Sequence, residues 1–152
     1  MQLHANKIPD SRNLAIQRYT MKKVAFICVH NSCRSQMAEA LGKHFASDVF
    51  ESYSAGTQTK PQINPDAVRI IKACYGGDIS SQHSKLLSDI PELDIAISMG
   101  CNVAFPFIGR DFDEHWAIED STGCDDQTFI AAAKQIERKI LSLRKALAAQ
   151  EQ

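Results

Sequence analysis

The chain has 152 residues, of which 44% are hydrophobic and 23% charged, a composition typical of a domain that buries its own core. Its 17 Lys and Arg residues nearly balance 18 Asp and Glu residues, so no global field favours nucleic acid or an anionic membrane. No apolar run approaches the ~18 residues that span a bilayer, and residues 1–20 lack the apolar centre of a secretory signal. We therefore expect a cytoplasmic monomer with neither a nucleic-acid nor a membrane partner.

Strand and helix signals alternate along the chain after its first residues. Residues 1–20 show no sustained period and predict a flexible N-terminal extension, whereas residues 21–152 predict a single domain. Lys23–Val29 is a nearly continuous apolar run, typical of a strand buried on both faces of a parallel sheet, and Ser35–Phe45 changes to helical spacing. Further strands are expected at Val49–Ser54, Leu93–Met99 and His115–Ile118, and further helices between Pro65 and Gly76, at Ser84–Ile90 and at Gln127–Ala148.

This alternation predicts an α/β fold. Strands separated by helices form right-handed crossover units, which build an open parallel sheet. We expect four strands in that sheet and helices on both of its faces.

The cysteines suggest chemistry more than structure. Their number is odd and they form no CxxC pair, which disfavours both a disulfide scaffold and a zinc site. In a reducing compartment such cysteines are candidates for catalysis or redox exchange. The five are Cys28, Cys33, Cys74, Cys101 and Cys124.

The junction between the first strand and the first helix, residues 28–35, is the strongest candidate for a site, and we call it the oxyanion loop. Open α/β sheets bind ligands at the carboxyl ends of their strands. The loop lacks the glycines of dinucleotide and nucleotide-phosphate loops but has a Cys-x5-Arg spacing. Its backbone N–H groups and the helix dipole suit a tetrahedral oxyanion. The residues expected to bind this anion are Val29, His30, Asn31, Ser32, Cys33, Arg34 and Ser35.

Cys28 is the expected nucleophile. The helix N-terminus and the Arg34 guanidinium favour its thiolate, which is the reactive form, and Arg34 offers a planar fork to two oxygens of the anion. Ser35 can donate a hydrogen bond to the Cys28 sulfur. The alternative, a buried strand cysteine followed by a surface arginine, is disfavoured by the strand and helix on either side and by Asn31 and Ser35.

The sequence VHNSCRSQMAEA resembles the signature of the low-molecular-weight phosphatase superfamily. Its NSCRSQMAE form is similar to that of the thiol-linked arsenate reductases in this superfamily, whereas the related tyrosine phosphatases usually carry Ile in place of Ser32 and Pro in place of Gln36. The resemblance implies a low-molecular-weight phosphatase-like fold and reduction of arsenate to arsenite, with phosphate and sulfate as competing anions. It covers the chain from about Lys22 to the C-terminal helix and includes YSAG at 53–56, MGCNV at 99–103, EHW at 114–116 and ED at 119–120.

Arsenate reduction needs a second thiol, because two thiols supply two electrons by forming a disulfide. Cys101 follows the third strand and should emerge at the same sheet edge as Cys28. We expect Cys28 to attack arsenate and Cys101 to attack the Cys28 sulfur, so that arsenite leaves and a disulfide forms. The resemblance also assigns Asp120 as the acid that protonates the departing oxygen, with Ser121 where the family usually has Pro.

The expected reductant is an external thiol, with no tightly bound cofactor. Thioredoxin-coupled relatives carry a third cysteine soon after the second, but Phe105 occupies that place here. This favours glutathione or a glutaredoxin-type thiol, or direct attack by thioredoxin on the Cys28–Cys101 disulfide. Cys124 in a polar loop is an alternative shuttle, and Cys33 can pair with Cys28 under oxidation.

Some relatives bind potassium beside the loop through residues that match Asn31, Glu39 and Ser54. The residue that matches their Asp is Lys85. An ammonium can replace the cation electrostatically, so we expect neither a potassium requirement nor a bound metal.

Two other functions stay open. A low-molecular-weight tyrosine phosphatase would hydrolyse phosphomonoesters through a Cys28 phosphocysteine, with Arg34 and Asp120 in the same roles and Cys101 idle. However, Ser121 and Thr122 follow Asp120 where such phosphatases usually place Pro and Tyr. The second is an oxyanion-binding module without turnover.

Overall fold

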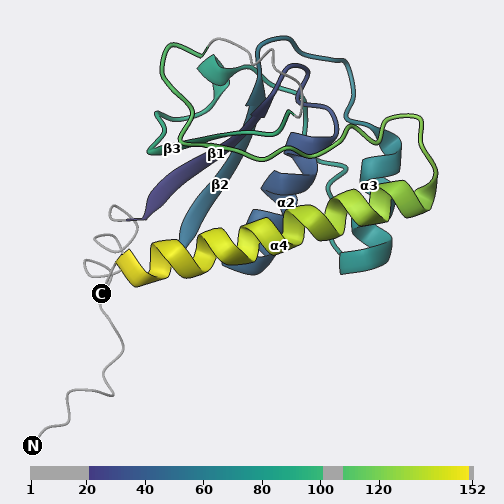
Figure 1. Ribbon diagram of the computed structural model, residues 1–152. Helices are drawn as coiled ribbons and strands as arrows, with labels where there is room; N and C mark the ends of the chain where they lie inside the picture. The colour runs from purple at the N-terminus through teal and green to yellow at the C-terminus, as the bar shows by residue number, and fades with distance from the viewer. Residues whose placement is uncertain (1–20, 101–107, 151–152) are drawn as a thin grey trace, which may run out of the picture.

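The computed structural model describes residues 21–100 and 108–150 (Figure 1). Four strands form one parallel sheet in the order β2-β1-β3-β4, which confirms the predicted α/β fold. The expected extension over residues 1–20 and the expected resolving thiol Cys101 lie outside the described residues. The elements are β1 (Lys22–Cys28), α2 (Arg34–Ala46), β2 (Phe50–Gly56), α3 (Pro65–Tyr75), the 3-10 helix η2 (Leu87–Asp89), β3 (Ile95–Ser98), β4 (Glu114–His115) and α4 (Asp126–Gln150).

Strand β1 lies at the centre of the sheet, between β2 and β3. Its residues Val24 to Ile27 are fully buried, as expected for an apolar run covered on both faces. The strand ends at Cys28, which is paired with Gly56 at the end of β2. The carboxyl ends of the two strands therefore meet at the same edge.

The two faces of the sheet are covered differently. Val24 and Phe26 pack in one apolar cluster with residues of α2, α3 and α4, and Figure 1 shows these helices gathered on one side of the sheet. Ala25 and Ile27 face the other way, against residues that include Leu87 of η2. Within residues 21–100 and 108–150, the helices expected on both faces are thus three α-helices on one side and a 3-10 helix on the other. No helix in the described part of the chain is long and apolar enough to cross a membrane.

The helix expected at Ser84–Ile90 is reduced to η2, because backbone groups at its start bond elsewhere. The Lys85 N–H donates to Asn31 Oδ1 and the Lys85 carbonyl accepts from the Gly56 N–H. These bonds tie residue 85 to the oxyanion loop and to the end of β2, so they are not available to a helix.

The strand expected at His115–Ile118 is β4, which pairs only over Glu114–His115. After it the Ile118 N–H donates to the Trp116 carbonyl at 2.8 Å, which turns the chain out of the sheet. The turn presents the Ile118 carbonyl to Arg34. Trp116 and Ile118 are nevertheless buried in the core, and their burial explains why the segment has the sequence pattern of a buried strand.

Candidate active site

The oxyanion loop leaves the central strand at Cys28 and enters α2 at Arg34. Gly56 lies directly beneath it: a Cβ at this position would be 2.5 Å from the Val29 carbonyl oxygen. Only glycine lets the two backbones approach so closely. The Thr57 and Gln58 N–H groups both donate to that same oxygen at 2.9 Å, which fixes the first half of the loop.

Two donors point at the Cys28 sulfur. Asn31 adopts a left-handed backbone conformation with φ 52°, and its N–H donates to Cys28 Sγ at 3.2 Å. Ser35 Oγ lies 2.9 Å from the same sulfur and accepts a 2.8 Å hydrogen bond from Asn31 Nδ2. Because Ser35 Oγ accepts from Asn31, its own proton can be donated to the sulfur, as the sequence predicts. Two donors, one from the loop and one from the start of α2, thus converge on the Cys28 sulfur.

The start of α2 contributes further positive potential. Cys33 precedes the helix without a side-chain cap, and the first turn has no acidic residue. Uncapped N–H groups and the positive end of the helix dipole are therefore available to an anion in the loop.

Arg34 is oriented by backbone carbonyls in the segments that follow β3 and β4. Its Nη1 donates to the Ile118 carbonyl at 2.8 Å and to the Met99 carbonyl at 3.3 Å. These are its bonds to the described residues, so Nε and Nη2 have no protein acceptor there. The guanidinium is held at one end and can bind an anion with its other donors.

A cavity of about 230 Å³ opens above the loop. It brings Cys28, Arg34 and Asp120 together with Thr122, which follows Asp120 by two residues, and it adds Lys60, which no sequence motif identified. The predicted anion ligands Asn31 and Ser35 do not line the cavity but are fully buried behind it, where they support the loop. The described lining residues include no Phe, Tyr or Trp; they are Cys28, Val29, His30, Ser32, Cys33, Arg34, Lys60, Asp120 and Thr122.

The carboxylate of Asp120 is fixed by a short turn. Its Oδ1 accepts from the Thr122 hydroxyl at 2.7 Å and from the Thr122 N–H at 3.0 Å. Burial opposes ionisation, but these bonds, together with the charges of Arg34 and Lys60, hold the pKa of Asp120 below its usual range. The resting site therefore contains a carboxylate at this position.

Cys33 differs from Cys28, although both line the cavity. Burial, with a smaller contribution from the Asp120 charge, raises the pKa of the Cys33 thiol to about 12. This cysteine is a neutral thiol at physiological pH, packed beneath the loop with 4% of its surface exposed. Cys124, the other cysteine considered for thiol exchange, is exposed.

Three of the candidate cation-site residues, Glu39, Ser54 and Lys85, meet around the carboxylate of Glu39, and Asn31 is bonded to the Lys85 N–H. Lys85 Nζ lies 3.0 Å from Glu39 Oε1 and 3.2 Å from Ser54 Oγ, and it donates to the His83 carbonyl at 3.3 Å. Lys43 binds the other carboxylate oxygen. Burial opposes ionisation of Glu39, but bonds from Lys43 and Ser54 and the charge of Lys85 hold its pKa below the usual range.

Gln36 connects this network to the oxyanion loop. The side chain is fully buried, and its Nε2 donates to the Asn31 backbone carbonyl and to Asn31 Oδ1 at 3.0 and 2.9 Å. The same group donates to the His83 carbonyl at 2.8 Å. Gln36 therefore holds Asn31 in its left-handed conformation. The sequence showed only that Gln36 stands where the related tyrosine phosphatases usually carry Pro, and did not reveal this role.

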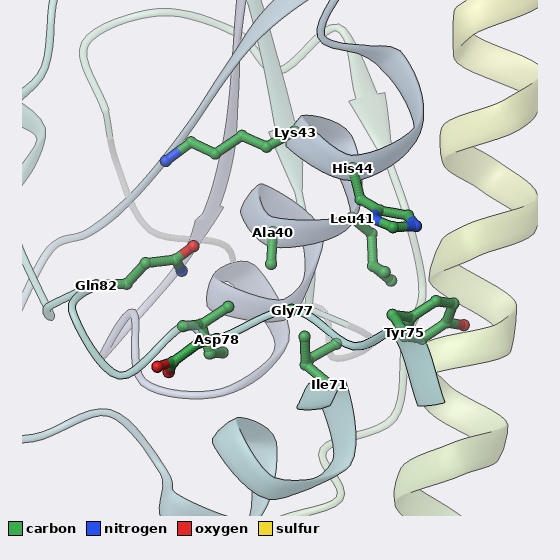
Figure 2. A pocket seen from close by; sticks show the side chains of 10 residues that line it. Ala40, Leu41, Lys43, His44, Ile71, Tyr75, Gly77, Asp78 and Gln82 are labelled. Carbon is green, nitrogen blue, oxygen red and sulfur yellow. The ribbon is translucent and has the colours of Figure 1, made fainter. Parts of the chain in front are cut away.

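A second hollow of about 240 Å³ lies between α2 and the end of α3 (Figure 2). Its lining includes Ala40, Leu41 and Ile71, with Tyr75 and Gln82 at its edges. It contains no cysteine and no arginine. Cys28 and Arg34, the residues predicted for covalent oxyanion chemistry, line the cavity above the oxyanion loop instead.

Comparisons with known proteins cover almost the whole described domain. The family model for low molecular weight phosphotyrosine protein phosphatase matches residues 23–152. A curated protein from Synechocystis sp. named glutaredoxin arsenate reductase is 32% identical over 128 residues. The match covers 81% of this chain and 96% of that protein.

Solved structures agree with the sequence match. An arsenate reductase in the phosphate binding state has a TM-score of 0.73 and 31% identity, and the match covers 84% of this chain and 99% of that one. A thioredoxin-dependent arsenate reductase from Corynebacterium glutamicum has a TM-score of 0.67 and 32% identity over 86% of this chain and 63% of its own. The chain therefore belongs to the low molecular weight phosphotyrosine protein phosphatase family.

Proposed function

We propose that this protein reduces arsenate to arsenite, with Cys28 as the nucleophile and thiols as the electron donors. The observation that carries the proposal is the set of groups around Cys28. Two hydrogen-bond donors contact its sulfur, the start of α2 has no side-chain cap, and the Arg34 guanidinium is held beside the loop. Relatives named arsenate reductases, more than 30% identical over most of the chain, support arsenate as the anion.

In the first step the Cys28 thiolate attacks arsenic. A sulfur–arsenic bond forms, and an arsenate oxygen leaves as water after it has gained protons. The loop N–H groups and Arg34 stabilise the negative charge on the remaining oxygens. We assign Asp120 to the handling of the departing proton; because the resting group is a carboxylate, the proton must first reach it from solvent or from the arsenate itself.

In the second step another thiolate attacks the Cys28 sulfur. A disulfide forms, the electron pair of the sulfur–arsenic bond passes to arsenic, and arsenic(V) leaves as arsenite, arsenic(III). We assign this attack to Cys101 or to an external thiol. Cys33 is a poor candidate because burial raises its pKa to about 12. The disulfide is then reduced by a glutaredoxin- or thioredoxin-type thiol, a choice that both kinds of relative support.

A phosphatase would use the same nucleophile and arginine. The described lining of the cavity offers it no aromatic side chain to hold an aryl ester, and a lysine stands at the mouth instead. The two cationic side chains in this lining, Arg34 and Lys60, favour a small, highly charged anion.

The test is a single turnover of the reduced protein with arsenate. We expect arsenite release and, by peptide mass mapping, a Cys28–Cys101 disulfide; Cys101→Ser should release arsenite only when glutathione is added. Steady hydrolysis of an aryl phosphate without arsenite, unchanged in Cys101→Ser, would instead make the protein a phosphatase. Binding of arsenate without either reaction would make it an oxyanion-binding module.

We further propose that Lys85 replaces a bound potassium ion. Its ammonium contacts Glu39 and Ser54 beside the oxyanion loop, where a cation would need those same oxygens. We expect the rate of arsenate reduction to change by less than about twofold when potassium is exchanged for sodium at constant ionic strength. A strong potassium dependence would contradict this assignment.

A further inference from the structure

Lys60 lines the catalytic cavity although no motif in the sequence includes it. It follows β2 in a segment that is bonded to the oxyanion loop at several points. The Lys60 N–H donates to Ser84 Oγ at 3.0 Å, and the Ser84 hydroxyl donates to the His30 carbonyl at 2.7 Å. The N–H groups of Thr57 and Gln58 add two bonds to the Val29 carbonyl. Residue 60 is thus held in a fixed relation to the loop.

The ammonium of Lys60 lies near one acidic group, the Asp120 carboxylate, but forms no ion pair with it. Within residues 21–100 and 108–150, its ammonium forms no ion pair, whereas Lys43 and Lys85 are both bound to Glu39. The ammonium is close enough to Asp120 to help lower the pKa of that carboxyl. The mouth of the cavity therefore contains a second cation besides Arg34, and this one is free to meet a ligand.

We propose that Lys60 is a specificity-determining residue that selects doubly charged tetrahedral oxyanions over singly charged ones. The proposal deepens the proposed function, on which it rests for the identity of the substrate as arsenate. A charge at the cavity mouth stabilises a bound anion in proportion to the anion's own charge. The ammonium therefore contributes about twice as much to the binding of a dianion as to that of a monoanion.

The experiment measures anion binding without turnover. Cys28 of the reduced protein is alkylated with iodoacetamide at constant ionic strength, and its modification is followed by peptide mass mapping. Sulfate, a tetrahedral dianion, and perchlorate, a tetrahedral monoanion, are titrated as protecting ligands. Each variant is compared with its own rate without anion, so a change in thiol reactivity does not affect the half-protecting concentration.

Lys60→Gln should raise the half-protecting concentration of sulfate about tenfold and that of perchlorate about threefold, the square root of the first factor. Lys60→Arg keeps the charge and should remain within about twofold of the wild type for both anions. Lys145→Gln removes one positive charge from an exposed position of α4 and should change neither, because distant surface charges are screened by salt.

Two results would overturn the proposal: unchanged sulfate protection in Lys60→Gln, or an equal loss for sulfate and perchlorate, which would indicate shape instead of charge. With arsenate as substrate, Lys60→Gln should raise KM about tenfold while kcat changes little. Suppose that the wild type releases no arsenite, but Lys60→Gln still raises the half-protecting concentration of sulfate more than that of perchlorate. The proposed function then fails, and the charge selection by Lys60 stands.

Discussion

Cys33 shares the oxyanion loop with Cys28, but its surroundings keep it protonated. Burial raises its pKa to about 12, so only about one Cys33 thiol in ten thousand is ionised at pH 8. Nucleophilic attack by a thiol requires the thiolate. At the scale of single residues, position in the oxyanion loop therefore does not by itself make a cysteine reactive.

We predict that iodoacetamide at pH 8 modifies the exposed Cys124 readily while Cys33 remains unmodified until well above pH 10. Peptide mass mapping after timed alkylation measures both. Cys33→Ala, which removes only the sulfhydryl group, should release arsenite in a single turnover at a rate within about threefold of the wild type. Equal alkylation of Cys33 and Cys124 at pH 8, or loss of arsenite release in Cys33→Ala, would show that Cys33 takes part in thiol exchange.

At the scale of elements, the end of β2 shapes the oxyanion loop from below. A Cβ on Gly56 would lie 2.5 Å from the Val29 carbonyl oxygen and 3.1 Å from the Asn31 nitrogen, both of them backbone atoms. Backbone atoms cannot rotate aside as a side chain can. The loop must therefore move if residue 56 gains a side chain.

Gly56→Ala should accordingly weaken sulfate protection of Cys28 by at least about tenfold and lower the free energy of unfolding by about 1–3 kcal/mol. Gly77→Ala is the matched control, because its Cβ would meet only Ile71 Cγ2 at an ordinary 3.7 Å. Alkylation protection and urea unfolding, with circular dichroism to verify folding, measure both variants. Unchanged protection in Gly56→Ala would mean that the loop has room that its contacts do not indicate.

The elements that sequence predicts well are those whose signals are local. The buried run of β1 and the caps of α3 need only neighbouring residues: Asn64 Oδ1 accepts from the Asp66 N–H, and Gly76 ends the helix at φ 74°. The segments around η2 and β4 are predicted less accurately, because their backbone groups bond to Asn31, Gly56 and Arg34 from distant parts of the chain. No local pattern records such bonds.

The same distinction applies to the site. Cys28, Arg34 and Ser35 are contiguous with the strand-to-helix junction, so their spacing is enough to place them in one loop. Lys60 reaches the cavity only because β2 lies beside β1 in the sheet, and Gln36 acts through His83, 47 residues away. Predicting these residues requires the topology in addition to the sequence.

At the scale of the whole molecule, a buried charge cluster links the loop to the stability of the fold. Glu39 is 5% exposed and binds Lys43, Lys85 and Ser54. Lys85 in turn donates its backbone N–H to Asn31 of the oxyanion loop. Because burial is outweighed by these bonds, the pKa of Glu39 is lower in the folded protein than its usual 4.5. The unfolded chain therefore binds more protons than the folded one at pH values around and between these two pKa values.

Because the pKa of Glu39 is lower in the folded state, its ionisation contributes fully to the free energy of unfolding above about pH 4.5. The contribution is lost as the pH falls through the lower pKa of the folded state. Glu39→Gln should lower the free energy of unfolding at pH 7 by about 2–4 kcal/mol, because it leaves Lys85 largely buried without its carboxylate. It should also flatten the decline of stability between pH 5 and pH 3, measured by urea unfolding at each pH. Glu92→Gln removes an exposed carboxylate, and its curve of unfolding free energy against pH should run parallel to that of the wild type. Parallel curves for Glu39→Gln and the wild type would show that the cluster does not stabilise the carboxylate form of Glu39, and the replacement of potassium by Lys85 would then lose its electrostatic basis.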